Sequence, residues 1–246
     1  MLDIQNIYKT FNPGTVNEKQ ALRGVSLHLD PGDFVTVIGG NGAGKSTMLN
    51  AVAGVWPLDS GKIIIDGTDV TGLPEHKRAK YIGRVFQDPM TGTAATMQIE
   101  ENLALARRRG QRRTLRSGIT KAERAEYKEL LKILDLGLED RLTSKVGLLS
   151  GGQRQALTLL MATLQKPKVL DATDRIVTRD ALTTIMITHN MRDAIVHGNR
   201  LIMMNEGQII LDIRGEEKSR LTVEDLLHQF EKVSGQEFAS DKAILG

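Results

Sequence analysis

The sequence of 246 residues contains no cysteine and few aromatic residues, which make up 4% of the chain. The lack of cysteine excludes disulfides, thiolate metal sites and a cysteine nucleophile, and it suits a reducing cytosol. A long hydrophobic run is also missing, because the longest apolar stretch, residues 156–164, is far too short to span a bilayer. The N-terminal residues have no apolar core of signal-peptide length. We therefore expect any membrane role to be peripheral.

The chain also lacks a strong excess of charge of one sign, since its formal net charge is +3. Such a weak excess does not indicate a nucleic-acid partner, and none is expected. With 40% apolar and 26% charged residues, the composition is typical of a soluble globular protein. A dense basic run, RRRGQRRTLR at residues 107–116, is interpreted as a solvated face. Contact with anionic lipid headgroups is the alternative.

The apolar pattern divides the chain into an α/β core and a helical insert. Short apolar runs between Gly, Pro and Asp predict strands at residues 25–29, 34–39, 62–67 and 81–87, with a helix at 45–54. Helical spacing then predicts an insert at 89–165. Strands return at 182–189, 200–207 and 208–213, the last two as a hairpin, before a closing helix at 222–235. The expected parts are a core at 1–88 and 166–215, a helical subdomain at 89–165, and a helical tail at 216–246.

The stretch GGNGAGKST, residues 39–47, fits the pattern G-x-x-x-x-G-K-[ST] of a phosphate-binding loop. It follows a predicted strand and opens a predicted helix, which is the context that this pattern requires. Its glycines allow backbone N–H groups to turn inward around an anion, and the helix start adds positive potential. Lys45 is expected to reach the β- and γ-phosphates, and the Ser46 hydroxyl to hold Mg²⁺. The candidate nucleotide-binding residues are Gly39, Gly40, Asn41, Gly42, Ala43, Gly44, Lys45, Ser46 and Thr47.

A second motif, LSGGQ, follows the helical insert and consists of Leu149, Ser150, Gly151, Gly152 and Gln153. It places a serine at a predicted helix start, followed by two glycines that permit the close approach of another group. Such a helix start can bind phosphate, although a plain serine N-cap is the simpler alternative. The motif resembles the signature of ATP-binding-cassette (ABC) ATPases, and the resemblance covers residues 2 to about 213.

Three further residues resemble functional residues of this family. Gln87, in VFQDP, is similar to the Q-loop glutamine, which contacts Mg²⁺ or water. His189, in IMITHN, is similar to the switch histidine, which contacts the γ-phosphate. Phe11, in YKTF, is similar to the aromatic residue that stacks on adenine, with Tyr8 as the competing ring. By this resemblance Lys45, Gln87 and His189 act in catalysis.

The resemblance implies an α/β fold: a P-loop NTPase (RecA-like) core with an antiparallel β subdomain and an inserted α-helical subdomain. It implies the ATP-binding and ATP-hydrolysing subunit of an ABC transporter, with ATP and Mg²⁺ as cofactors. In the family, ATP lies between the phosphate loop of one copy and the signature serine of a second copy, head to tail. Separate transmembrane permease subunits carry the solute, and an extracytoplasmic substrate-binding protein is a further expected partner. The expected location is the cytoplasmic face of the cell membrane.

One family motif is incomplete in the stretch KPKVLDATD, residues 166–174. In the family, a buried strand ends in an Asp that orients the Mg²⁺ shell, and the Glu that polarises the attacking water comes next. Here two apolar residues precede Asp171, the residue after it is Ala172, and no Asp-Glu pair occurs between Ser150 and His189. That interval is about 15 to 20 residues shorter than the family pattern. Asp171 is nevertheless the candidate for the metal-shell aspartate.

Two explanations of the short interval are open. In the first, the written chain is contracted around Leu170–Ala172, because residues were deleted or omitted. In the second, the protein is a natural degenerate member, an ATP-gated clamp that hydrolyses ATP poorly. We favour the first, because the flanking motifs are intact and loss of a central strand would expose backbone groups and apolar faces. If the gap is genuine, loss of the general base alone lowers the rate by about 10²–10⁴-fold.

Overall fold

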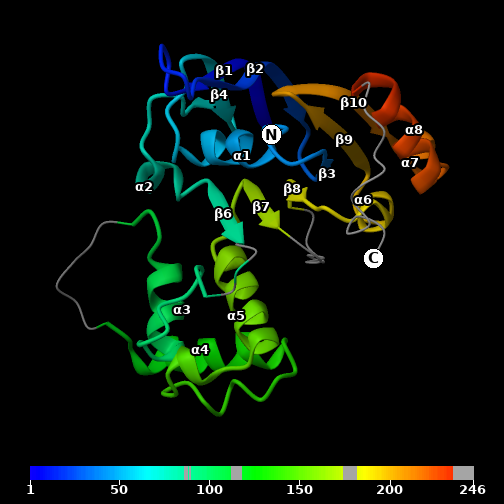
Figure 1. Cartoon of the computed structure of the whole chain (residues 1–246). Helices are drawn as coiled ribbons and strands as arrows, with labels where there is room; N and C mark the ends of the chain where they lie inside the picture. The colour runs from blue at the N-terminus through cyan, green and yellow to red at the C-terminus, as the bar shows by residue number, and fades with distance from the viewer. Residues whose placement is uncertain (86–87, 89, 112–117, 174–181, 235–246) are drawn as a thin grey trace.

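The structure is a computed structural model that describes residues 1–85, 88, 90–111, 118–173 and 182–234. Two β-sheets with their helices form the upper part of Figure 1, and a separate group of helices lies below them. The candidate residue Gln87 falls outside the described residues. Within them, no helix combines the length and apolarity that crossing a membrane requires.

The first sheet is antiparallel and contains four strands in the order β2-β1-β4-β5. The bounds are β1 (Leu2–Phe11), β2 (Lys19–Leu29), β4 (Ser60–Ile65) and β5 (Thr68–Asp69). The sequence does not predict β1, and it predicts only the second half of β2. The reason is a bulge: Asn6 has a φ of 48°, and the register with β2 shifts between Ile4 and Ile7. Such a shift interrupts the alternation by which strands are recognised.

The second sheet contains six strands in the order β10-β9-β3-β8-β7-β6. The bounds are β3 (Phe34–Ile38), β6 (Ile82–Val85), β7 (Val169–Thr173), β8 (Thr184–Ile187), β9 (Arg200–Asn205) and β10 (Gln208–Arg214). All neighbours pair in parallel except β9 and β10, which form the expected hairpin. Its two turn residues, Glu206 and Gly207, both have positive φ, as a tight hairpin turn requires.

Strand β7 is longer than its short apolar run indicates. It continues through Asp171, which pairs with Arg84 of β6 on one side and Ile185 of β8 on the other. Two partner strands supply hydrogen bonds to its backbone, so the strand persists beyond its last apolar residue. Strand β7 is therefore present through Thr173, between β6 and β8, so the contraction considered above does not remove it.

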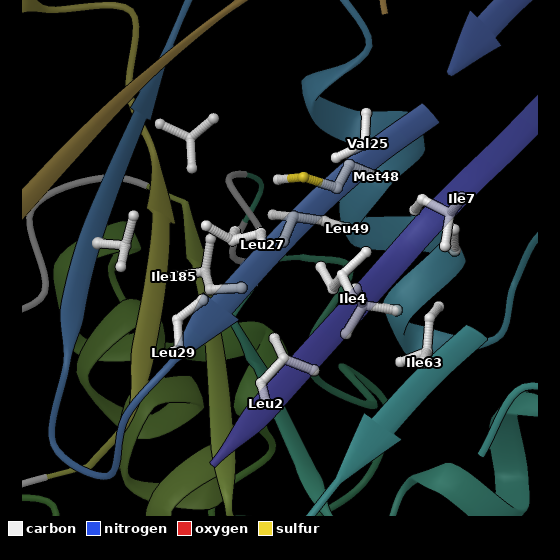
Figure 2. Packing of buried hydrophobic residues seen from close by; sticks show 14 of the residues in the cluster. Leu2, Ile4, Ile7, Val25, Leu27, Leu29, Met48, Leu49, Ile63 and Ile185 are labelled. Carbon is white, nitrogen blue, oxygen red and sulfur yellow. The ribbon is translucent and has the colours of Figure 1, made fainter. Parts of the chain in front are cut away.

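The main core packs helix α1 (Lys45–Ala53) against the inner face of the antiparallel sheet and against the parallel strands. Figure 2 shows its apolar side chains directed toward one another. They come from β1, β2, β4, β8 and α1: Leu2, Ile4, Ile7, Val25, Leu27, Leu29, Met48, Leu49, Ile63 and Ile185. This packing fixes the start of α1 beside the ends of β1 and β2.

The opposite face of the parallel sheet is covered by helices from the C-terminal part of the chain. They are α6 (Met191–Val196), α7 (Gly215–Ser219) and α8 (Val223–Ser234). Leu226 and Phe230 of α8 pack with Met191 and Leu201 in a second apolar cluster. Thr222 precedes α8 as its N-cap, since its hydroxyl accepts from the Asp225 N–H at 3.2 Å.

The helical insert has a core of its own, built around Tyr127, Leu131 and Leu157. Its elements are α3 (Ile99–Arg107), α4 (Lys121–Lys132), the 3₁₀ turn η1 (Val146–Leu148) and α5 (Gly151–Thr163). The short helix α2 (Glu75–Arg78) lies with the sheets instead. The C-terminal end of α5 packs closely on the sheet: a Cβ atom on Gly83 of β6 would lie 2.6 Å from the Ala162 carbonyl oxygen.

The first residues of the basic run are only partly solvated. Arg107 forms an ion pair with Glu126, and Arg108 forms one with Glu123 at 2.7 Å. Arg109 donates to the Ala162 carbonyl at 3.2 Å, and burial lowers the pKa of its guanidinium. These three arginines therefore tie α3 to α4 and α5. Residues 112–117 of the run lie outside the described residues.

Candidate nucleotide-binding site

The phosphate-loop residues connect β3 to α1 through a backbone that only glycine tolerates. Gly39, Gly42 and Gly44 have φ values of 145°, 80° and 102°. A Cβ atom on Gly39 would lie 2.2 Å from the Met204 carbonyl oxygen, and one on Gly44 would lie 2.6 Å from that of Ala21. Both positions lack room for a side chain because the backbones of β9 and β2 lie against the loop.

The remaining loop residues differ in exposure. Asn41 and Gly42 are exposed at the tip, whereas Ala43 is buried and its carbonyl accepts from the Gly207 N–H at 3.0 Å. Gly40 is half-buried. The loop is thus anchored through its buried end and open at its tip, where a ligand can approach.

Lys45 folds back over this loop. It is 5% exposed, and its ammonium donates to the carbonyl oxygens of Gly39 at 2.7 Å and Gly40 at 2.9 Å. Burial lowers its pKa, and among the described residues no carboxylate pairs with it. An anion held in the loop would stabilise the charged lysine and meet a cation that is already in place.

The start of α1 is open to an anion as well. Gly44 provides no side-chain cap, and the first turn holds no acidic residue. Helices α4 and α5, by contrast, begin with capping boxes formed by Thr120 and Ser150. The first N–H groups of α1 therefore lack a side-chain acceptor, which is the electrostatic basis of phosphate binding at helix starts. Ser46 is exposed in this turn, and Thr47 is half-buried.

Two aromatic rings lie at one edge of the site. Phe11 ends β1 and meets Trp56 edge to face, with ring centroids 5.4 Å apart and an interplanar angle of 85°. The Lys9 ammonium lies 5.6 Å from the Phe11 ring centroid. Trp56, 40% exposed, has no motif that would identify it from the sequence. The competing ring, Tyr8, packs instead over Gly24, whose added Cβ would meet the tyrosine hydroxyl at 2.8 Å.

His189 is exposed directly after the buried end of β8. The preceding residue, Thr188, donates its N–H to the Val37 carbonyl of β3 at 3.2 Å. Parallel pairing of β3 and β8 brings their C-terminal ends to the same edge, and a small pocket there is lined by Gly39 and His189 together. The structure therefore places His189 beside the phosphate loop.

Lys19 is a charged residue near the loop that the sequence analysis does not identify. Its ammonium lies 3.0 Å from the position that a Cβ atom on Gly42 would occupy. No sequence signal identifies it, because a lysine at the start of a predicted loop or strand is ordinarily solvated. Only the pairing of β1 with β2 brings it to the loop.

The signature residues form the start of α5. The Ser150 hydroxyl accepts from the Gln153 N–H at 3.2 Å, and the Gln153 side chain accepts from the Ser150 N–H at 3.2 Å. Ser150 is therefore an N-cap, as the simpler interpretation holds, and it keeps its hydroxyl hydrogen for another acceptor. Gly151 and Gly152 are exposed, with open space where a Cβ would lie. Nothing in the described part of the chain requires glycine at these two positions.

The structure does not bring the signature to the phosphate loop of the same chain. Ser150 lies at the end of α5 that points away from the sheets, while the other end packs on β6 (Figure 1). A helix of 13 residues is about 20 Å long. The phosphate loop and the signature therefore form separate parts of one chain's surface.

The donors available for Mg²⁺ are few but fit its chemistry. Mg²⁺ bound with a nucleotide takes one or two protein oxygens and completes its shell with phosphate and water. The exposed Ser46 hydroxyl beside Lys45 is such an oxygen. Asp171 lies on strand β7, whereas Gln87 is outside the described residues. Among the residues that the structure describes, no group of three or more acidic or histidine side chains gathers as a metal cage.

Comparison with known proteins matches this geometry to one family. A family model described as ABC transporter matches residues 22–172. The tyrosine transport ATP-binding protein of Clostridioides difficile (strain R20291) is 40% identical over 251 residues, covering 94% of this chain and 99% of the relative. Because 94% of 246 residues is about 231, this alignment contains about 20 positions at which the chain has no residue.

More distant relatives are longer than this chain. The sulfate/thiosulfate import ATP-binding protein CysA of Methylococcus capsulatus is 34% identical over 85% of the chain. The spermidine/putrescine import ATP-binding protein PotA of Aggregatibacter actinomycetemcomitans is 30% identical over 86%. The chain spans 61% and 57% of their lengths, respectively.

Solved structures that resemble this chain are also ATP-binding cassettes. An ATP-binding cassette in a dimeric, post-hydrolysis state with ADP and Pi has a TM-score of 0.72 and 25% identity, over 87% of this chain and 98% of that one. A nucleotide-free cassette from an ABC transporter has a TM-score of 0.70 and 27% identity, over 89% and 92%. The α/β P-loop fold expected from the sequence is thereby confirmed. The chain belongs to the ABC transporter family, as one of its ATP-binding cassettes.

Proposed function

We propose that the protein hydrolyses ATP and powers solute transport through separate permease subunits, by closing and opening a dimer of cassettes. The observation that carries this proposal is the separation, within one chain, of two helix starts that we assign to the same triphosphate. The uncapped start of α1 with Lys45 forms one, and the exposed start of α5 with Ser150 forms the other. A triphosphate can contact both only if a second copy, turned head to tail, supplies the second feature.

In this proposal the two copies share the contacts to each nucleotide. Phe11 stacks on the adenine, and the loop N–H groups with Lys45 bind the β- and γ-phosphates. His189, beside Gly39, contacts the γ-phosphate. Ser150 of the second copy donates its free hydroxyl hydrogen to the same phosphate. Closure depends on the γ-phosphate, so its loss after hydrolysis favours opening.

Mg²⁺ fits this site through Ser46, with Gln87 and Asp171 as further candidate ligands. When bound, it neutralises charge on the β- and γ-phosphates as the bond between them breaks. The chain's own contribution is to hold the phosphates on fixed donors, so that little reorganisation is needed during the reaction. Attack by water also needs a base, and Ala172 occupies the position after Asp171 where the family has its glutamate.

The partners follow from the relatives. Two of them are named as import proteins and one as a transport protein, which supports import through permease subunits at the cytoplasmic face of the membrane, with an extracytoplasmic binding protein. The tyrosine transport relative makes amino acids the cargo class to test first. A groove lined by His76 and Lys80 on one side and by Glu101 and Arg108 on the other is our candidate for permease docking.

The test is nucleotide-dependent dimerisation of the purified protein, measured as molar mass in solution. With saturating ATP and Mg²⁺ we expect the mass of a dimer, and without nucleotide the mass of a monomer. Lys45→Ala should remain monomeric under both conditions, because it removes the cation from the loop. A wild-type protein that stays monomeric with ATP, or a Lys45→Ala variant that dimerises equally well, would refute the proposal.

A further inference from the structure

Lys19 lies between the aromatic edge of the site and the phosphate loop. It opens β2, where its Cα is paired with that of Phe11 on β1. Its Nζ approaches the loop at Gly42, at 3.0 Å from the position of an added Cβ. Gly42 has a φ of 80° and belongs to the exposed loop tip. One cation therefore reaches from the strand end that carries Phe11 to the turn that would surround the phosphates.

The Lys19 ammonium has no partner within the described part of the chain. The neighbouring cation, Lys9, is paired with Asp59 at 3.1 Å. The adjacent acid, Glu18, accepts from the Gly14 N–H at 2.7 Å. No carboxylate or carbonyl in the described ranges accepts from Lys19, although its side chain bends toward the loop. Its charge is therefore available to an anion that enters the loop.

We propose that Lys19 is a further nucleotide-binding residue, whose ammonium contacts the phosphate chain at the end next to the ribose. This rests on the proposed function, because it takes ATP to be the ligand of the loop. Lys45 at the start of α1 serves the terminal phosphates, whereas Lys19 comes from the side of Phe11. A compact ammonium on a flexible stem suits a phosphate contact that tolerates several rotamers.

Binding of ATP and of ADP to variants, measured by calorimetry, tests this assignment. Lys19→Met removes the charge and keeps most of the stem, and we expect it to weaken both nucleotides about tenfold, as for a charge-assisted hydrogen bond. Lys19→Arg keeps the charge and should stay within about threefold of the wild type. The matched control is Lys62→Met, another exposed lysine of the same sheet, which should bind both nucleotides as the wild type does.

Salt separates an electrostatic contact from a structural effect. Charges at a surface are largely screened at about 1 M ionic strength, so the difference between Lys19→Met and the wild type should shrink there. Thermal unfolding of Lys19→Met without nucleotide should coincide with that of the wild type, because the side chain is exposed and unpaired.

The outcomes distinguish this inference from the proposed function. Equal ATP binding by Lys19→Met and Lys62→Met would overturn the role of Lys19, as would an Arg variant that loses as much as the Met variant. A loss of ATP affinity in Lys19→Met that does not shrink at high salt would also overturn the role of Lys19. If Lys19→Met gives such a result but Lys45→Ala weakens ATP binding in the same series, the proposed nucleotide site is supported and only the role of Lys19 is refuted. If the wild type binds no ATP, both the proposed function and the role of Lys19 are refuted.

Discussion

At the scale of single residues, two buried cations cap helices to which they do not belong. Arg78 donates to the carbonyl oxygens of Ala51 at 2.7 Å and Val52 at 2.9 Å, at the C-terminal end of α1. Lys218 donates to the carbonyls of His197 and Gly198 at the end of α6. Neither helix has a basic residue in its own last turn. These cations satisfy carbonyls and complement the negative end of the helix dipole.

Lys218 should make stability depend on pH in the alkaline range. Burial lowers its pKa from 10.5 to about 8. Between these values the unfolded chain binds more protons than the folded protein, so the free energy of unfolding rises with pH. The slope of this contribution is at most about 1.4 kcal/mol per pH unit.

Urea unfolding of the wild type and of Lys218→Met between pH 7 and 10 measures this contribution. The stability of the wild type relative to the variant should be constant below about pH 8 and increase above it. A difference that stays constant up to pH 10 would mean that the buried lysine keeps its ordinary pKa.

At the scale of elements, the start of α5 is a place where a substitution can change dimerisation without lowering the stability of the monomer. Gly152 lies in the first turn, has open space around it and has no positive φ. Alanine fits there and favours helix, so Gly152→Ala should leave the stability of the monomer unchanged or raise it by up to about 1 kcal/mol. If ATP brings a second phosphate loop against this surface, the added methyl should weaken ATP-dependent dimerisation.

Thermal unfolding and molar mass with ATP, measured on the same preparations, check both parts of this prediction. Gly72→Ala is the matched control, because Gly72 is exposed with open space but lies outside the signature. It should dimerise as the wild type does. Full dimerisation of Gly152→Ala would place the contact surface away from the signature.

At the scale of the whole molecule, the connection from β7 to β8 is unusually short. The two strands are parallel neighbours, and only the ten residues 174–183 separate them. A parallel crossover ordinarily takes a dozen or more residues, usually including a helix. This short connection supports a contracted segment between the two strands.

The intact mass of the purified protein decides between the two explanations of this segment. The 246-residue sequence has a mass of 27.1 kDa. If a segment is missing from it, we expect the measured mass to be larger by the mass of about twenty residues, as the motif spacing indicates. A mass of 27.1 kDa would instead identify the ATP-gated clamp. A chain of 246 residues should then bind ATP with little turnover, since it lacks the base. Robust ATPase activity with the permease present, abolished in Lys45→Ala, would contradict that last expectation.

Much of the site could be predicted from the sequence because its residues are neighbours in the chain. The loop from Gly39 to Thr47 and the signature from Leu149 to Gln153 each depend on local backbone geometry. By contrast, β1 was not predicted, because the bulge at Asn6 interrupts its apolar alternation. Strand β7 continues beyond its apolar run because it pairs with both β6 and β8. In both strands, pairing with distant residues overrode the local pattern.

The sequence by itself determined the family, the phosphate loop, the helical insert and the absence of an acid directly after Asp171. Only the tertiary structure decided that Lys19 meets the loop, that Trp56 stands beside Phe11, and that Ser150 lies away from Lys45. The reason is physical. A motif read along the chain fixes dihedral angles and capping groups within a few residues, whereas a contact between strands or subdomains depends on register and on which faces are buried.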